Sequence, residues 1–217
     1  MGKFPLSFRI KKIVEILERE YERWDVPVKE LKKINFKNKF HILISSLIST
    51  RTKDEITKKV MEKFILKVKK PEDVLNMSLK EIEKIIYPVG FYKIKAKNIK
   101  KISEIIFKKY KGKIPDDFNQ LLKLPGVGRK VAKVILSYAF NKNVVAVDTH
   151  VARISKRIGI VNEKDFKKIE EKLEEIIPLN LKRKINYLFV ALGQKICLPR
   201  NPKCNVCPVE KYCDKII

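Results

Sequence analysis

Apolar residues recur with the period of an α-helix along most of this 217-residue chain. That spacing places them on one face of each helix, where they can pack against neighbouring elements. Ser78 and Glu81 have the spacing of a capping box, which predicts a short helix through Ile86. The run from Val144 to Val147 has a strand-like composition but is too short to seed a sheet. The other apolar stripes are formed by Ile10, Ile13, Val14, Leu17 and Tyr21; Ile99, Ile102, Ile105 and Ile106; Val151, Ile154 and Ile158; Phe166, Ile169, Leu173 and Ile176; and Ile185, Leu188, Phe189, Leu192 and Ile196.

Glycine and proline mark the places where these helices should end. Tight turns are predicted from Tyr87 to Tyr92 and from Leu124 to Gly128. The helix that carries the isoleucine stripe after residue 98 should end near Gly112, with this glycine as its C-cap. The whole pattern predicts an all-α chain of about ten helices.

Charge is the feature of the composition that most restricts the function. The chain has 50 Lys and Arg residues against 25 Asp and Glu, for a formal net charge of +25. Hydrophobic residues make up 45% of it, which indicates a folded protein rather than a basic tail. A thermophile-like surface is an alternative reading, but such surfaces usually balance lysine with glutamate. A polyanion that neutralises part of the charge is favoured, and nucleic acid is the expected partner.

No stretch of the sequence approaches the length of a membrane span. The first residues, MGKFPLSFRI, lack the long apolar core of a signal peptide. We therefore expect a cytoplasmic, nucleoid-associated monomer that makes no membrane contact and keeps its cysteines reduced.

All four cysteines of the chain lie in one C-terminal segment, at Cys197, Cys204, Cys207 and Cys213. This grouping favours a closed site with four thiolate ligands over buried single thiols or a disulfide framework. Structural zinc and a [4Fe-4S] cluster both use such ligands, and the spacing does not separate them. Arg200 and Lys203 lie between the first two cysteines. A bound metal would hold these two basic residues in a loop that can contact phosphates, or it would simply staple the C-terminal segment.

A glycine-rich turn precedes the helix predicted to begin at Arg129. Gly126 and Gly128 permit positive φ angles and close approach, and the free amides at a helix start bind anions. We therefore expect a phosphate contact formed by Gly126, Val127, Gly128 and Arg129. A helix corner without a ligand can use the same glycines, but here the turn precedes two basic residues in a strongly basic chain.

Lys130 follows in the first turn of that helix. An amine at the positive end of a helix, next to Arg129, can serve as a nucleophile, although an ordinary surface lysine is the simpler alternative. The helix to Phe140 would be about 18 Å long, and seven extended residues after it span about 23 Å. The chain can therefore return along the helix and bring Asp148 beside Lys130. Asp148 should also be the N-cap of the next helix.

Three motifs together resemble the endonuclease III branch of the helix-hairpin-helix DNA glycosylases. They are LPGVGRK at residues 124–130, VDTH at residues 147–150, and the spacing of the four cysteines. The resemblance implies an all-α fold of two domains with an active-site cleft between them. Residues 32–142 would form a six-helix barrel with the hairpin. Residues 1–31 and 143–217 would form a helical domain that carries a [4Fe-4S] cluster on the four cysteines.

The same resemblance implies a bifunctional DNA glycosylase and AP lyase of base excision repair. Its substrate would be double-stranded DNA with oxidised pyrimidines or abasic sites, cleaved 3′ to the abasic site by β-elimination. Lys130 would form the Schiff base and Asp148 would be the catalytic carboxylate. Arg51 stands where bacterial members usually have Gln, in a segment that fills the gap left by the flipped base. Val89 and Phe91 match the wedge loop.

Two other functions remain open from the sequence. A monofunctional or mismatch-directed (thymine or uracil) glycosylase of the same superfamily would use water instead of an amine, but relatives directed at mismatched adenine or thymine lack a lysine at position 130. A non-enzymatic helix-hairpin-helix protein would use the hairpin and the basic surface alone. His150 is expected to pack beside Asp148, and His41 to have no catalytic part.

Overall fold

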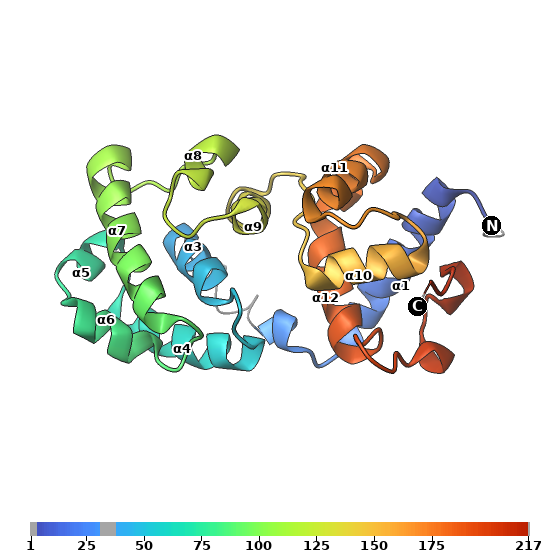
Figure 1. Ribbon diagram of the computed structural model, residues 1–217, viewed down its shortest axis with the longest axis horizontal. Helices are drawn as coiled ribbons and strands as arrows, with labels where there is room; N and C mark the ends of the chain where they lie inside the picture. Colours follow the sequence, from blue (N-terminus) through green and yellow to red (C-terminus); the bar gives the residue numbers. More distant parts are fainter. Residues whose placement is uncertain (1–3, 31–37, 217) are drawn as a thin grey trace. The chain divides into compact units, whose positions relative to one another are not determined.

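The computed structural model describes residues 4–30 and 38–216, and within these ranges the chain is built from α-helices and short 3-10 helices, with no strand (Figure 1). The all-α prediction is confirmed, and the run from Val144 to Val147 is an extended connection. The chain divides into two compact units, Met1–Lys29 with Lys142–Ile217, and Glu30–Asn141. The domain boundary expected at residue 32 lies outside the described residues, so the predicted domain limits stay a prediction. Within the described ranges, no helix combines the length and apolarity needed to cross a bilayer.

The unit Glu30–Asn141 is built around one apolar helix, α3 (Lys39–Ile48), in which every residue from Phe40 to Ile48 is buried. A helix that is apolar on all sides must be covered on all sides. Helix α9 packs on α3, and α7 contacts α3, α5 and α6 (Figure 1). The other elements of this unit are α4 (Asp54–Lys67), α5 (Pro71–Leu75), α6 (Leu79–Ile86), α7 (Tyr92–Tyr110), α8 (Phe118–Leu122) and α9 (Arg129–Phe140).

Local signals set the ends of several of these helices. Ser78 and Glu81 form the predicted capping box at the start of α6, with both reciprocal hydrogen bonds present. The C-cap of α7 is Lys111, one residue before the predicted Gly112. Lys111 and Gly112 both have left-handed backbone conformations, and the Gly112 amide donates to Ile106 O at 3.0 Å. The helix therefore ends in a cap of two residues, of which the predicted Gly112 is the second.

The second unit packs four helices around one apolar core. Helix α12 contacts both α1 and α10, and the predicted stripes of these helices are buried. Phe166 departs from its predicted stripe, since it is 49% exposed. It is the first residue of its helix, and side chains at a helix start lean outward beyond the end of the helix. The elements of this unit are α1 (Leu6–Arg23), α10 (Thr149–Ile158), α11 (Phe166–Ile176), η1 (Leu179–Leu181), α12 (Lys182–Lys195), η2 (Cys204–Val206) and η3 (Glu210–Tyr212).

A buried arginine ties the N-terminal helix of this unit to its C-terminal segment. Arg9 on α1 is 6% exposed and donates to the backbone oxygens of Tyr212, at 3.1 Å, and Ile158. Its guanidinium also pairs with Asp214 at 3.1 Å. Removing one partner of a buried ion pair lowers the stability of the fold more than removing one partner of an exposed pair, because the remaining polar groups stay buried without a partner.

Replacing Arg9 should therefore destabilise this unit strongly. We expect Arg9→Ala to lower the free energy of unfolding by about 3–5 kcal/mol, because Asp214 and the two carbonyl oxygens lose their donor. Arg23→Ala on the same helix is the matched control. Its side chain is 76% exposed, so its effect should stay within about 0.5 kcal/mol. Urea titrations followed by circular dichroism measure both values, and equal midpoints for the two variants would contradict the assignment.

Candidate active site

The turn before α9 requires glycine at Gly126, its third residue. The Val127 amide donates to Leu124 O at 3.1 Å and closes the turn. Gly126 has a φ of +79°, which side chains other than glycine rarely adopt. A Cβ at this position would lie 2.6 Å from Asn98 Nδ2 and 2.9 Å from Leu47 Cδ1. The turn is therefore pressed against α7 and α3, and only glycine fits there.

The first turn of α9 lacks a side-chain cap. Gly128 is the N-cap of this helix. The amides of the first turn have no partner inside the helix, so they can bind a phosphate oxygen. The Val127 amide donates within the turn and its side chain is buried, and the phosphate contact expected of residues 126–129 stays a prediction. The Arg129 guanidinium lies over the Phe118 ring, 5.1 Å from the centroid.

Lys130 and Asp148 both stand at helix starts. Lys130 is the second residue of α9 and is half-buried. Asp148 is the N-cap of α10, as predicted, and its Oδ1 accepts from the amides of His150 and Val151, each at 2.9 Å. These two bonds fix the direction of the carboxylate. Lys130 belongs to the unit Glu30–Asn141 and Asp148 to the other, so the predicted meeting of the two side chains stays a prediction.

His150 packs against its own helix neighbours. Its Nδ1 lies 3.1 Å from a guanidinium nitrogen of Arg153. The contact places the His150 ring against its own helix, and its expected packing beside Asp148 stays a prediction. His41 is also structural, since it is buried and its Nε2 bonds Val68 O at 2.8 Å.

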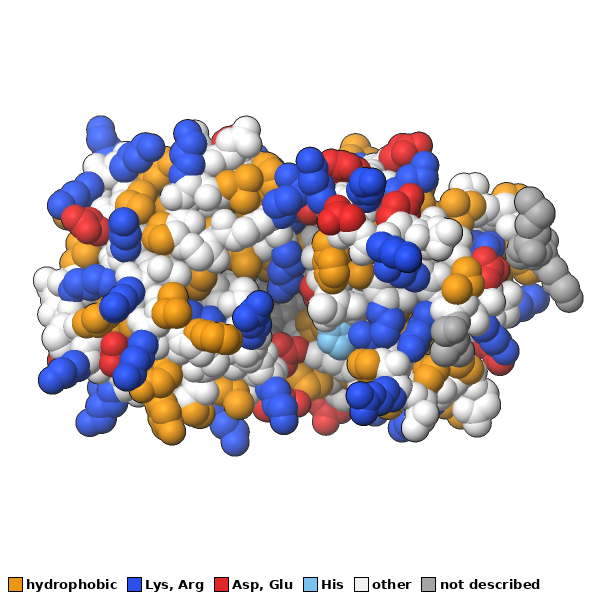
Figure 2. All heavy atoms as spheres, viewed as in Figure 1, with side chains coloured by type: hydrophobic (Ala, Val, Ile, Leu, Met, Phe, Trp, Pro, Cys, Tyr) orange, Lys and Arg blue, Asp and Glu red, His pale blue; other side chains and the backbone are white. Residues whose placement is uncertain are grey.

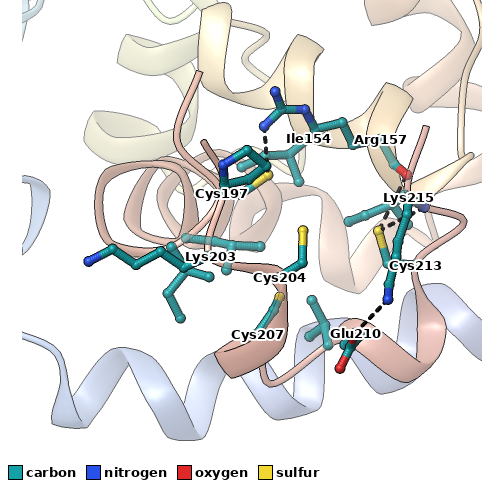
Figure 3. Close-up of a pocket in the computed structure, with 14 residues that line it drawn as sticks. Ile154, Arg157, Cys197, Lys203, Cys204, Cys207, Glu210, Cys213 and Lys215 are labelled. Atoms are coloured by element: carbon teal, nitrogen blue, oxygen red, sulfur yellow. Dashed lines mark hydrogen bonds and ion pairs between the residues drawn. The ribbon is translucent and has the colours of Figure 1, made fainter. Parts of the chain in front are cut away.

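The four cysteines line one cavity (Figure 3). Apolar side chains of α10 and α12, including Ile154 and Leu192, form its inner wall. In the described part of the chain, no three Cys, His, Asp or Glu side chains come together as the ligands of a single metal ion. Burial raises the pKa of Cys207 to about 11 and raises that of Cys213 as well.

Two arginines that the sequence reasoning missed hold the loop between the first two cysteines. Arg153 donates to Cys197 O at 2.9 Å, and Arg157 donates to Leu198 O at 2.6 Å and Pro199 O at 2.9 Å. Both arginines lie on α10, four residues apart and so on one face. That spacing is visible in the sequence, but their acceptors are backbone oxygens, which no residue pattern reveals.

The loop between Cys197 and Cys204 is exposed after Pro199, the last residue that the two arginines contact. Arg200 and Lys203 are both exposed, and Figure 3 shows the Lys203 side chain directed away from the cavity. Their expected phosphate contacts stay a prediction. Figure 2 shows Lys and Arg side chains spread over the visible surface of both units, while Asp and Glu side chains are fewer and gather over α11.

The Arg51 segment and the predicted wedge loop touch within their unit. Gly90 N donates to Thr52 Oγ1 at 3.3 Å, and a Cβ on Gly90 would lie 2.6 Å from Arg51 O. The Arg51 guanidinium lies 5.5 Å from the centroid of the Phe91 ring, which is 57% exposed. Val89 is only 2% exposed, so its predicted wedge role does not agree with its burial. Phe91 is the exposed apolar side chain of this loop.

The helical fold, the glycine turn before α9 and the four-cysteine cavity together define the architecture of a helix-hairpin-helix DNA glycosylase. The HhH-GPD model, described as a superfamily of base excision DNA repair proteins, matches residues 44–179. Endonuclease III of Thermotoga maritima is 40% identical over 175 residues, which cover 81% of this chain and 82% of that protein. The chain belongs to the HhH-GPD superfamily of base excision DNA repair proteins.

Solved structures show the same fold over nearly the whole chain. A trapped endonuclease III–DNA covalent intermediate is 31% identical, with a TM-score of 0.84 and coverage of 96% of both chains. A thermostable thymine-DNA glycosylase is 28% identical, with a TM-score of 0.80 and coverage of 95% of this chain and 94% of that one. The predicted fold class and family are both confirmed.

The two glycines of the turn should respond differently to substitution. Gly126→Ala forces a Cβ into Asn98 and Leu47 at a positive φ, and we expect a loss of about 2–4 kcal/mol in unfolding free energy. Gly128→Ala meets nothing within 4 Å and should cost at most about 1 kcal/mol as an N-cap change. Thermal unfolding of both variants measures the difference. Equal losses would show that the turn is not packed as described.

Proposed function

We propose that this protein is a bifunctional DNA glycosylase and AP lyase that removes damaged pyrimidines during base excision repair. The observation that carries this proposal is Lys130, an amine in the first turn of α9 directly behind the glycine turn. Membership of the HhH-GPD superfamily and the similarity to endonuclease III support it. The likeness to a trapped endonuclease III–DNA covalent intermediate supports a covalent step.

Binding would begin with the phosphate backbone. The first-turn amides of α9 and the exposed side chains Arg200 and Lys203 offer donors for phosphate oxygens, which position a duplex without reading its sequence. The damaged nucleotide is then turned out of the stack, at a cost of a few kcal/mol that a poorly stacked lesion reduces. Double-stranded DNA with a damaged base or an abasic site is the partner we propose, bound by one copy of the chain. Such an enzyme works in the compartment that holds the DNA, the cytoplasmic nucleoid in our proposal.

The chemistry follows from one amine and one carboxylate. As the bond between C1′ and the base breaks, positive charge develops on the sugar, and the Asp148 carboxylate stabilises it. The Lys130 nitrogen bonds to C1′ and the base leaves with the electron pair of the broken bond. Loss of a proton from nitrogen and opening of the sugar give a Schiff base, which acidifies the hydrogens on C2′. Removal of one of them breaks the C3′–O bond, and the 3′ phosphate leaves.

The alternative is a glycosylase that activates water and leaves the strand intact. The similar thymine-DNA glycosylase indicates that the fold also supports a glycosylase directed at thymine. The amine of Lys130 favours the lyase, because a water-activating enzyme needs a carboxylate but no nucleophilic lysine. A protein that only binds DNA would need neither.

We propose a [4Fe-4S] cluster as the group held by Cys197, Cys204, Cys207 and Cys213. All four line one cavity, and four thiolates serve either zinc or a cubane cluster. Membership of the HhH-GPD superfamily and the similarity to endonuclease III favour the cluster. When bound, the cluster supplies a cross-link between the four cysteines. Arg153 and Arg157 hold the loop at its first cysteine, so Arg200 and Lys203 would be presented from a fixed support.

Removing the Lys130 amine should abolish strand cleavage without abolishing DNA binding. We expect Lys130→Ala to lose the covalent adduct formed with an abasic duplex in borohydride and to lower cleavage by about a thousandfold or more. Its affinity for the duplex should fall by less than about tenfold, because one charge is lost. Lys133→Ala, one turn further along α9, is the matched control and should keep the adduct. Gel separation of the reduced mixture measures both.

Two results would decide against this mechanism. Wild-type protein that releases a damaged base but forms no adduct would identify the water-activating glycosylase. Wild-type protein that binds the duplex but releases no base and cuts no strand would identify a protein that only binds DNA.

Metal analysis tests the cluster independently of activity. We expect about four iron and four sulfide ions per chain, since four thiolates serve one cubane. Cys204→Ser should lower the iron content and expose the loop that carries Arg200 and Lys203 to proteolysis. Purified protein with one equivalent of zinc and no iron would overturn the assignment.

A further inference from the structure

Lys95 on α7 is a buried cation held by oxygens that are not carboxylates. It is 5% exposed, and its Nζ donates to Ile48 O at 2.8 Å, Thr50 O at 2.5 Å and Thr52 Oγ1 at 3.1 Å. An ammonium has three hydrogens, so these three acceptors satisfy it completely. Burial lowers the pKa of Lys95 to about 8, and the ammonium is still the main form at neutral pH.

These contacts clamp the backbone on both sides of Arg51. Thr50 and Thr52 are its two neighbours, and Ile48 is the last residue of α3, whose carbonyl end carries a partial negative charge. Arg51 itself has a φ of +52°, a conformation that non-glycine residues seldom adopt. Such a backbone persists where its surroundings fix it, and the Lys95 ammonium does so here.

The clamp extends to the loop that carries Phe91. The hydroxyl that receives the Lys95 ammonium, Thr52 Oγ1, also accepts the Gly90 amide at 3.3 Å. Phe91 has a left-handed backbone as well, with a φ of +59°. Arg51 and Phe91 are exposed side chains from two separate loops. The hydrogen bonds of Lys95 and Thr52 connect the backbones of these two loops.

An exposed ring beside a guanidinium is suited to an unstacked base. Aromatic side chains stack on bases, and a guanidinium donates to base edges or stacks on them in turn. The Arg51 guanidinium already lies over the Phe91 ring, so the two side chains present one combined surface. A shift of either loop would separate them.

We propose that Lys95 is a positioning residue, which holds Arg51 and Phe91 together as one rigid probe that unstacks bases around a lesion. This inference rests on the proposed glycosylase function. Lys95 does not contact DNA itself, and it acts through the segment around Arg51. Its loss should impair the release of a stacked damaged base far more than cleavage at an abasic site, where no base has to be extruded.

The same helix provides a matched control. Lys100, on α7, donates to Val74 O at 3.1 Å, Leu75 O at 2.8 Å and Met77 O. It therefore binds the end of α5 as Lys95 binds the end of α3, and its acceptors belong to a different segment from Arg51. Lys100→Met removes the same kind of interaction without touching the proposed probe.

The experiment compares full-length Lys95→Met, Lys100→Met, Arg51→Ala and the double variant Lys95→Met with Arg51→Ala. Single-turnover rates are measured on one duplex with thymine glycol and on one with a preformed abasic site. We expect Lys95→Met to slow base release by roughly ten- to a hundredfold and abasic-site cleavage by less than about threefold. Lys100→Met should leave both rates within about threefold. The double variant should be no slower than the slower single variant, because both changes disable one probe.

Thr52→Val guards against a folding defect in Lys95→Met. It keeps the shape of the side chain and removes only the hydroxyl that joins Lys95 to Gly90, so it should slow base release in the same direction. Equal slowing of both reactions by Lys95→Met and Lys100→Met, or additive effects in the double variant, would overturn the positioning role.

A binding signal separates this proposal from the proposed function. A duplex with 2-aminopurine opposite the lesion brightens when that base unstacks, whether or not any bond is cut. Wild-type protein and Lys100→Met should brighten it, and Lys95→Met should not. An inactive wild-type protein would refute the glycosylase function alone, whereas equal brightening by all three would refute the role of Lys95.

Discussion

Backbone carbonyl oxygens hold several buried and half-buried cations of this chain. With 25 acidic residues against 50 basic ones, carboxylates cannot partner every cation of the sequence. Lys95 and Lys100 instead bind the carbonyl ends of α3 and α5, where the helix dipole is negative. Arg153 and Arg157 bind the carbonyls that follow α12. Each of these four cations thus satisfies oxygens that a loop would otherwise leave without donors, and in doing so it fixes that loop.

Two of the loops fixed in this way carry residues that we assign to DNA contact. Lys95 holds the segment around Arg51, and the arginines of α10 hold the segment before Arg200. The turn before α9 is fixed by another means, the close packing of Gly126 on α3 and α7. Each candidate contact is therefore rigid within its own unit, as binding a phosphate or an extruded base with little loss of entropy requires.

Local signals carried the successful predictions from sequence. Helical period, the Ser78 capping box and the position of Asp148 before an apolar stripe each involve neighbouring residues, and the structure confirms all three. The clamp by Lys95 could not be read from the sequence, because its acceptors are mainly backbone oxygens, which every residue has. Val89 and Phe91 looked alike as wedge residues, and only packing separates the buried side chain from the exposed one. The expected pairing of Lys130 with Asp148 rests on the motif resemblance and on the reach of the extended segment after α9. It is tested by the covalent adduct that Lys130 should form with DNA.

The most direct test is to locate the covalent bond between protein and DNA. Wild-type protein would be incubated with an abasic duplex and borohydride, digested with a protease and a nuclease, and mapped by tandem mass spectrometry. We expect the residual deoxyribose on the peptide that contains Lys130, attached to the side-chain nitrogen. A sugar attached to another lysine or to the N-terminal amine, or no modified peptide at all, would contradict the role of Lys130 as the nucleophile.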